Sequence, residues 1–380
     1  MNGPLLVIHP GADVSTGDVY QGLVPALKRL GVPVVEYPLN AMLPLSKAWL
    51  AFLRRRQLKR GGPLKDVAPT PQDILYHASA QAIERALFFG CSWVLVLTGM
   101  YFSLRVVRQL RRAGLKLAVL FTESPYDTST EFAFAAEADL CWTIERTSLS
   151  TLRLACPRTQ YLPHAYDPAK HRPPGADEQD GGVPAHDVVF VGSGFEERIA
   201  LLSAVDWSGV DFGLYGAWQM LGSRHPLRRH LRAGEVDNAY AAALYRRARV
   251  GLNLFRSSVG HGPGTPKVSG AESLSPRLLE LAACGSFTVS EWRQEVGEVF
   301  GGAVPVFRDA AGLQSLLGYW LSPEAEGKRE QWARSLPGRV RGRTFEQMAR
   351  TVARDLMKAD ADGEPWRPLE ERFGVHRHAA

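Results

Sequence analysis

The sequence predicts an α/β protein with two doubly wound, Rossmann-like domains that face a cleft, followed by a C-terminal helix. Two observations carry this prediction. Short apolar runs alternate with longer stretches of helical periodicity, which is typical of parallel sheets covered by helices on both faces. Residues 173–187, PPGADEQDGGVPAHD, contain almost no core-forming side chains, so they mark a linker that divides the alternation into two series.

The candidate strands form one group on each side of this linker. The first group lies at 5–9, 32–37, 93–97, 116–121, 139–144 and 159–163, and the second at 188–192, 211–216, 250–255, 286–290 and 304–307. We therefore predict a first domain over 1–172, the linker, a second domain over 188–343, and a C-terminal helix and tail over 344–380. Ligands of such sheets bind beyond the carboxyl ends of the strands, so the natural site is the cleft between the domains.

Two helical segments stand out near the ends of the chain. Residues 344–358, TFEQMARTVARDLMK, carry apolar side chains at helical spacing, which predicts a helix with one buried face. These side chains are Phe345, Met348, Val352 and Leu356. Near the start, Pro25 interrupts a helical pattern, so we expect the first helix to be unusual.

Composition places the chain among ordinary globular proteins, with 45% hydrophobic and 22% charged residues. No apolar run approaches the roughly 18 residues needed to cross a bilayer. The opening MNGPLLVIHPG lacks the basic flank of a signal peptide, so we expect a first strand there. The four cysteines have no CxxC spacing, and we expect buried free thiols in a reducing cytoplasm. They are Cys91, Cys141, Cys156 and Cys284.

The net charge is +6 and the isoelectric point is about 9.2. Much of the excess lies in four basic runs, at 53–60, 225–232, 245–249 and 338–343. The simpler interpretation is that these runs are solvated helix faces. The alternative is a phosphate-bearing partner: a nucleotide, a nucleic acid or an anionic surface.

One short helix combines core residues with charge. Ser275 followed by Pro276 is a helix start, with Ser as N-cap and Pro at the first helical position, and Gly285 is a natural stop. The predicted helix, 276–284, is apolar nearly all round and should be buried. Arg277 is one of its two charged residues.

The charged residues of this helix suggest a ligand. Arg277 and Glu280 are three apart and share a face, and Glu272 lies in the loop before the helix. Arg277 and the N-terminal amides favour phosphate, whereas the two carboxylates can accept hydrogen bonds from sugar hydroxyls. This pattern suits a nucleotide-sugar. The alternative is a surface ion pair between Arg277 and Glu280.

The spacing from Glu272 to Glu280, followed by an Ala-Cys-Gly turn, resembles the signature of group 1 glycosyltransferases with the GT-B fold. The full segment SLSPRLLELAACGSF resembles the CgeB-like (spore maturation protein) glycosyltransferases more closely than it resembles the group 1 enzymes in general. Four further segments resemble that family in the right order: FTESPYD at 121–127, YLPHAYDPAKH at 161–171, VVFVGSGFEER at 188–198 and YRRARVGLNLF at 245–255. The resemblance covers roughly residues 120–300.

The resemblance implies an acceptor-side first domain and a second domain that binds a nucleotide-sugar. There, Glu280 would bind the ribose, and Arg277 with the amides near Ser275 would bind the diphosphate. Glu272 would contact the transferred sugar. Further donor-binding residues would follow the first strands of the domain: Gly192, Ser193 and Gly194 at the phosphates, Arg198 neutralising the leaving diphosphate, and Val236 beside the base.

Catalysis also needs a group that orients or deprotonates the acceptor hydroxyl. Glu123, which follows an apolar strand, is the first candidate. Asp18 and Asp127 are weaker candidates, because helix capping and turn stabilisation explain them as well. His164 is expected to be structural. Relatives of this fold generally work without a metal ion, so neither a metal nor a cofactor is expected.

These inferences predict a cytoplasmic hexosyltransferase that uses a nucleoside-diphosphate sugar, with UDP favoured. The predicted acceptor is a glycan or envelope precursor, or a modified base in DNA. The DNA alternative arises because the basic runs could bind along a phosphate backbone. Two alternatives remain open. One is a nucleotide-sugar isomerase of the 2-epimerase type, and the other is a non-catalytic protein that binds a nucleotide-sugar.

Overall fold

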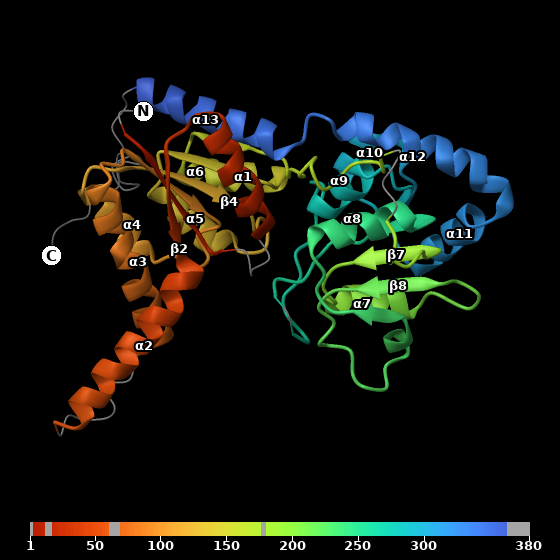
Figure 1. Cartoon of the computed structure of the whole chain (residues 1–380), viewed down its shortest axis with the longest axis horizontal. Helices are drawn as coiled ribbons and strands as arrows, with labels where there is room; N and C mark the ends of the chain where they lie inside the picture. Colours follow the sequence, from red (N-terminus) through yellow and green to blue (C-terminus); the bar gives the residue numbers. More distant parts are fainter. Residues whose placement is uncertain (1–2, 12–16, 61–68, 176–179, 261, 363–380) are drawn as a thin grey trace. The chain divides into compact units, whose positions relative to one another are not determined.

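The computed structural model describes residues 3–11, 17–60, 69–175, 180–260 and 262–362. The chain forms two compact units. Unit 1 comprises the residues up to Leu162 together with those from Phe345 onward, and unit 2 comprises Pro163–Thr344. Each contains a parallel sheet with helices packed against it, which confirms the predicted fold class of two Rossmann-like domains (Figure 1).

Unit 1 is built on a six-stranded sheet in the order β2-β1-β3-β4-β5-β6, with every neighbouring pair parallel. Its strands are β1 (Leu5–His9), β2 (Val34–Pro38), β3 (Trp93–Leu97), β4 (Lys116–Phe121), β5 (Leu140–Thr143) and β6 (Thr159–Tyr161). Its helices are α1 (Gly17–Arg29), α2 (Leu39–Leu58), α3 (Pro71–Phe88), α4 (Leu104–Arg112), α5 (Thr128–Ala136), α6 (Leu149–Ala155) and α13 (Phe345–Ala361). The strand order changes direction between β1 and β3.

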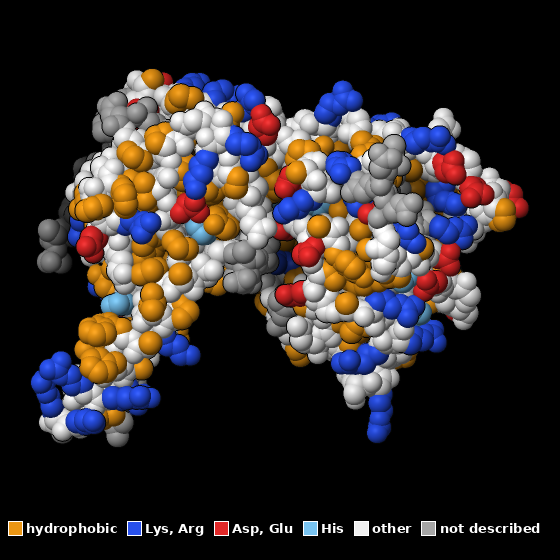
Figure 2. All heavy atoms as spheres, viewed as in Figure 1, with side chains coloured by type: hydrophobic (Ala, Val, Ile, Leu, Met, Phe, Trp, Pro, Cys, Tyr) orange, Lys and Arg blue, Asp and Glu red, His pale blue; other side chains and the backbone are white. Residues whose placement is uncertain are grey.

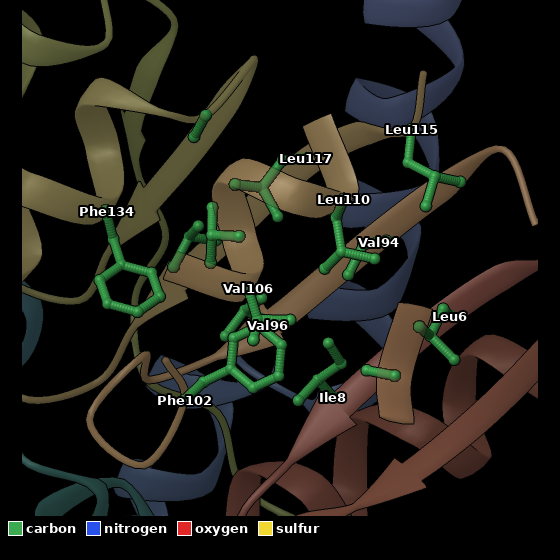
Figure 3. Close-up of a cluster of buried hydrophobic side chains, with 14 of the residues drawn as sticks. Leu6, Ile8, Val94, Val96, Phe102, Val106, Leu110, Leu115, Leu117 and Phe134 are labelled. Carbon is green, nitrogen blue, oxygen red and sulfur yellow. The ribbon is translucent and has the colours of Figure 1, made fainter. Parts of the chain in front are cut away.

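The central strands of unit 1 are buried on both faces because their runs are apolar throughout. Every residue of β1 and β3 is buried. One face packs against α4 and α5, where side chains of the strands meet those of the helices (Figure 3). The labelled members of this cluster are Leu6, Ile8, Val94, Val96, Phe102, Val106, Leu110, Leu115, Leu117 and Phe134. This packing fixes the ends of β1, β3 and β4 along one edge of the sheet.

Helix α13 returns to unit 1 and packs along α1 (Figure 1). The predicted helix is confirmed, and its four expected apolar residues are all buried. The approach to α1 is close: a Cβ added at Gly22 would lie 2.0 Å from the Phe345 ring. Two polar contacts also tie α13 to the sheet, because Trp142 Nε1 donates to Asp355 (3.1 Å) and Trp93 Nε1 donates to Asp360 (3.1 Å). The chain's last described helix therefore completes the first unit.

Helix α1 runs without a break from Gly17 to Arg29 with Pro25 inside it. A proline inside an unbroken helix is the unusual feature found here, and the loop before α1, residues 12–16, lies outside the described residues. Because proline has no N–H donor, the helix has one internal hydrogen bond fewer at Pro25.

Unit 2 also has a six-stranded parallel sheet, in the order β12-β11-β10-β7-β8-β9. Its strands are β7 (Val188–Val191), β8 (Phe212–Tyr215), β9 (Leu231–Ala233), β10 (Val250–Asn253), β11 (Thr288–Glu291) and β12 (Val306–Phe307). Its helices are α7 (Glu196–Ser203), α8 (Asn238–Arg247), α9 (Pro276–Ala283), α10 (Gln294–Phe300), α11 (Ala310–Trp320) and α12 (Glu326–Val340). Numbered within the unit, this order is 3-2-1-4-5-6, that of dinucleotide-binding folds, with its switch point between β7 and β10.

The boundary between the two units lies before the predicted linker. The crossing into unit 2 lies at Leu162–Pro163, ten residues before the expected end of the first domain. The described end of the expected linker belongs to unit 2, where Asp180 pairs with Arg246 and the buried His186 bonds the Tyr215 hydroxyl at 2.8 Å. All four cysteines are buried and free, as expected.

Candidate functional site

The start of α9 lies at the carboxyl edge of the unit 2 sheet. Ser275 is its N-cap: the Ser275 Oγ accepts a hydrogen bond from Leu278 N (3.3 Å) and donates one to Asn253 Oδ1 (2.7 Å). Asn253 ends β10 and is fully buried, and its amide nitrogen donates to Ser290 Oγ on β11 (2.9 Å). The predicted Ser-Pro helix start is therefore present, and it is bonded to the two strands between which α9 crosses.

Arg277 lies at the switch point of this sheet. Its Nε donates to the carbonyl of Val191 at the end of β7, and its Nη1 donates to the carbonyl of Leu254 just beyond β10 (3.2 Å). The guanidinium lies over the Phe190 ring, 4.6 Å from its centroid. Burial lowers the pKa of Arg277 from its ordinary value. Arg277 thus places a positive charge where ligands of doubly wound sheets bind.

Glu280 follows Arg277 by one helical turn and is 9% exposed. The two charges interact, because the Glu280 carboxylate opposes the effect of burial on the pKa of Arg277. The expected charged residues of a largely buried helix are present. Glu280 is buried and Arg277 is half-buried, so neither is a fully exposed surface residue.

Arg198, on α7, brings a second guanidinium to the same place. It donates to the carbonyls of Ser193 (2.9 Å), Leu254 (3.0 Å) and Phe255 (3.2 Å). Arg198 and Arg277 therefore share the Leu254 carbonyl, so two cationic groups meet at the β7/β10 switch point. Three nitrogen atoms of Arg198 donate to backbone oxygens, so its side chain holds together the loops that follow β7 and β10.

The glycine-rich turn after β7 admits these neighbours. A Cβ at Gly192 would lie 2.1 Å from Arg277 Nη2, and the φ of Gly192 is +156°. A Cβ at Gly194 would lie 2.4 Å from the Trp218 ring. The amides of Gly192 and Gly194 donate to Tyr215 O (2.9 Å) and Ala217 O (2.8 Å). In this structure the glycines make room for side chains, and these two amides are already paired with the loop after β8, whereas Ser193 lies between them.

The segment before α9 is anchored to α10. The Glu272 carbonyl accepts from Glu295 N (3.1 Å), and the buried Glu295 carboxylate accepts from Leu274 N (2.7 Å). Arg293 Nη1 donates to Ser273 O (2.8 Å). Glu272 itself is half-buried. These contacts hold the backbone of Glu272 beside the start of α9, so the side chain extends from a fixed point.

Val236 follows β9 at the same edge of the sheet. It is partly buried against a cluster that includes Val189 and Tyr215. Two residues earlier, the Gly234 carbonyl accepts from Gly216 N (2.9 Å), so this segment is tied to the loop after β8. The expected donor-binding residues of unit 2 thus all follow, or lie near, the carboxyl ends of its strands.

The expected catalytic residues of unit 1 lie on two elements. Glu123 is 7% exposed and comes two residues after β4, where its carbonyl accepts from Tyr126 N (2.7 Å). Asp18 lies in the first turn of α1 and is half-buried. Asp127 is the N-cap residue of α5. His164, expected to be structural, lies at the start of unit 2, and burial together with Arg293 and Arg343 lowers its pKa to about 4.

A set of buried polar side chains at the carboxyl edge of unit 1 was not predicted. His9, Thr98 and Thr122 follow or end the adjacent strands β1, β3 and β4, and each is at most 9% exposed. Both ring nitrogens of His9 and the hydroxyls of both threonines lack a hydrogen-bond partner within the described part of the chain. Because buried polar atoms are normally paired, these atoms mark a place where a ligand's hydroxyl groups can bind.

His9 is held in a fixed orientation. Its ring stacks on Tyr20, with centroids 3.6 Å apart, and its Nε2 lies 3.6 Å from Glu36 Oε2. Tyr20 donates to the same Glu36 carboxylate (3.0 Å). Burial lowers the pKa of His9 to about 4, with Glu36 acting in the opposite direction, so the ring is neutral at neutral pH. The sequence signal is present in LLVIHP, where a titratable ring ends a wholly apolar strand.

Glu131, on α5, is the most perturbed carboxylate near this edge. Burial raises its pKa from 4.5 to about 8, and the Ser124 hydroxyl lies 2.8 Å from both carboxylate oxygens. The negative charges of Asp127 and Glu123 act in the same direction as burial. Glu131 is therefore mostly protonated at neutral pH.

This shift makes a pH prediction for Glu131→Gln. Because the pKa of Glu131 is raised from 4.5 to about 8, its contribution to stability is full below pH 4.5 and is lost as pH rises through about 8. Relative to the variant, which cannot ionise, the wild type should therefore lose free energy of unfolding across this window. Urea unfolding of both proteins at about pH 5, 7 and 9 measures it. A difference between the two proteins that stays constant with pH would contradict the assignment.

Comparisons with known proteins agree with this geometry. Residues 198–354 match the family described as "Glycosyl transferase-like". No curated protein matches the chain. The N-terminal domain of Candida albicans trehalose-6-phosphate phosphatase is 12% identical, with a TM-score of 0.61, over 94% of this chain and 97% of that one.

Two further solved structures resemble the chain over nearly its whole length. Anabaena HepE, in complex with UDP-glucose, is 11% identical, with a TM-score of 0.57, over 94% of this chain and 100% of that one. The UDP-forming trehalose-phosphate synthase of Burkholderia xenovorans, in complex with glucose-6-phosphate, is 12% identical, with a TM-score of 0.59, over 93% and 100%. The structural likeness gives the chain the GT-B fold, and residues 198–354, less than half of the chain, resemble a glycosyl transferase-like domain.

Proposed function

We propose that this glycosyltransferase-type chain moves a sugar from a UDP-sugar to an acceptor hydroxyl without a metal ion. The observation that carries the proposal is the position of Arg277: its guanidinium spans the β7 and β10 ends at the switch point, with Glu280 one turn further along α9. A diphosphate at that point meets positive charge, and a ribose beside it meets a carboxylate.

The donor half of the reaction needs charge stabilisation at the leaving diphosphate. As the bond between the anomeric carbon and the diphosphate oxygen breaks, its electron pair stays with the UDP oxygen. Arg277 and Arg198 place two cationic groups at this edge, and the capped start of α9 adds its dipole. Two of the similar proteins support UDP as the nucleotide, because one holds UDP-glucose and another is named as UDP-forming.

The acceptor half needs a group that takes the proton of the attacking hydroxyl. We place the acceptor at the carboxyl edge of unit 1, against His9, Thr98 and Thr122, whose polar atoms lack partners among the described residues. The acceptor oxygen forms the new bond to the anomeric carbon and its proton passes to a base. Neutral His9 and Glu123 are the two candidate bases, and His9 has the better-defined orientation.

The finer assignments rest on the sequence. Within the GT-B enzymes, the motif around Glu280 favours the CgeB-like group, and we propose a cytoplasmic enzyme acting on a glycan or envelope precursor. A modified DNA base is the competing acceptor. It predicts binding that weakens steeply with salt, whereas a neutral glycan predicts almost no salt dependence.

The test is a panel of UDP-, GDP-, TDP- and ADP-sugars with a thermal-shift readout, followed by turnover of the hit with and without candidate acceptors. A UDP-sugar should raise the melting temperature most, and transfer should require an acceptor. Conversion of the free donor to an epimer would support the 2-epimerase alternative. Binding without any turnover would support the non-catalytic alternative, and no shift with any of the four would contradict the donor site.

We predict that His9→Gln lowers acceptor-dependent transfer by about 10²-fold, which is the usual contribution of a general base. The thermal shift caused by the donor should be unchanged, because His9 lies in unit 1 and the donor residues lie in unit 2. Glu123→Gln, measured in parallel, decides between the two candidates. Full activity of His9→Gln together with loss in Glu123→Gln would show that Glu123 is the base.

A further inference from the structure

The outer face of α2 carries large apolar side chains that the unit 1 core does not use. Leu45, Trp49 and Phe52 are 63%, 50% and 52% exposed, and their spacing places them on one side of the helix. The rings of Trp49 and Phe52 stack with centroids 5.6 Å apart. With His77 and Gln81 of α3, this face borders a groove of about 510 Å³.

The same helix ends in a group of exposed cations, here called the basic end: Arg55, Arg56, Lys59 and Arg60. Arg56 follows Phe52 by four residues, so the apolar face continues directly into positive charge. Residues 39–60 contain no Asp or Glu. Figure 2 shows apolar side chains of α2 and α3 gathered beside a group of lysine and arginine side chains where α2 ends.

Among the described residues, no carboxylate forms an ion pair with the basic end. Asp73 lies at the start of α3, but its carboxylate accepts from the amide and hydroxyl of Thr70 in a capping box. Large exposed apolar patches in globular proteins mark interaction sites, and this one lies beside the densest of the four basic runs. The occupant must therefore offer an apolar phase and negative charge side by side.

A bilayer containing anionic lipids offers both, because its acyl chains lie directly below a layer of phosphate groups. Aromatic side chains prefer this boundary, and arginine and lysine bind the phosphates while their stems lie along the apolar region. Among the described residues no helix is long and apolar enough to cross a membrane. The charge and the apolar area of α2 thus fit a helix that rests on a membrane rather than one that spans it.

We propose that α2 docks this protein onto an anionic membrane surface, with Trp49, Phe52 and Leu45 inserted at the headgroup level and the basic end on lipid phosphates. The proposal does not depend on the transferase assignment. Membrane binding is measured without donor or acceptor, so failure of one leaves the other standing.

The experiment is co-flotation of the full chain with vesicles of phosphatidylcholine alone or with about 30% phosphatidylglycerol. We expect binding to the anionic vesicles that is at least about tenfold stronger than to the neutral ones and that falls as NaCl rises to about 0.5 M. The proposal is overturned by no flotation with anionic vesicles at low salt, or by equal flotation with both compositions.

Paired variants locate the surface. Trp49→Ser with Phe52→Ser should abolish flotation, and its control, Leu87→Ser with Phe88→Ser, changes two exposed apolar residues at the far end of α3 and should not. Arg55→Gln, Arg56→Gln and Lys59→Gln together should remove the preference for anionic lipid. Their control is Arg112→Gln, Arg334→Gln and Arg350→Gln, which removes the same charge from exposed positions on other helices.

The same variants exclude other occupants. Brominated lipid should quench tryptophan fluorescence of the wild type, and Trp49→Phe should lose this quenching while still floating. If Trp49→Ser with Phe52→Ser instead converts a dimer to monomers and leaves flotation intact, the face is a contact between copies and the proposal fails. It fails equally if both charge variants lose flotation alike, because general basicity then explains the binding.

Discussion

Replacing Arg277 with Ala is expected to lower sugar transfer by about 10²–10³-fold, the usual loss when one preorganised charge at a developing anion is removed. The side chain is the point where the ends of β7 and β10 and the start of α9 meet, because it donates to Val191 O and Leu254 O. The donor-induced thermal shift should fall with the activity, since the same charge binds the diphosphate in the ground state.

Arg277→Lys separates charge from geometry. Lysine keeps the positive charge but cannot donate in two directions from a planar group, so we expect it to restore part of the donor binding and little of the turnover. The control is Arg334→Ala, because Arg334 is an exposed arginine in a helical ion pair. Circular dichroism must show folded protein for each variant. An Arg277→Ala protein that is folded, binds UDP-sugar and transfers at the normal rate would end the donor-site proposal.

Val352→Asp is expected to lower the free energy of unfolding by at least about 3 kcal/mol, because it buries a carboxylate without a partner. Val352 is fully buried on α13, the helix that packs against α1. The expected outcome is a lower urea midpoint for the cooperative unfolding of unit 1. The effect is expected in unit 1 because α13 belongs to that unit.

The matched control is Met357→Asp, which adds the same charge five residues along the same helix at a position that is 54% exposed. That change should alter stability by no more than about 0.5 kcal/mol. Equal destabilisation by both substitutions would show that α13 does not pack through its Val352 face. Unfolding by urea, followed by circular dichroism and tryptophan fluorescence, measures both.

The fold class was predictable because both sheets are parallel and their central strands are buried on both faces. Such strands are largely apolar runs, and eleven of the twelve strands in the described residues lie at or within a few residues of the predicted positions. The missing strand is β9 (Leu231–Ala233). It is short, lies at the edge of its sheet and overlaps the end of a basic run, so only its pairing with β8 makes it a strand.

The candidate site was predictable in part. The start of α9 follows from local chemistry, since a capping serine and a proline at the first helical position define a helix end in any context. The convergence of Arg198 and Arg277 on Leu254 O was not visible in the sequence, because these residues are far apart along the chain. His9 was missed because nothing in LLVIHP says that its ring nitrogens lack hydrogen-bond partners among the residues that the structure describes.

The sequence by itself determined the alternation of strands and helices, the burial of the four cysteines, the limits of α9 and the existence of α13. Each follows from interactions between residues that are close along the chain: periodicity, capping and apolar composition. Only the tertiary structure decided that α13 completes unit 1, that two guanidinium groups share one carbonyl at the β7/β10 switch point, and that three polar side chains without a hydrogen-bond partner among the described residues line the edge of β1, β3 and β4. The order of strands in a sheet sets these contacts, and that order is fixed by packing between segments that the chain brings together only when it folds.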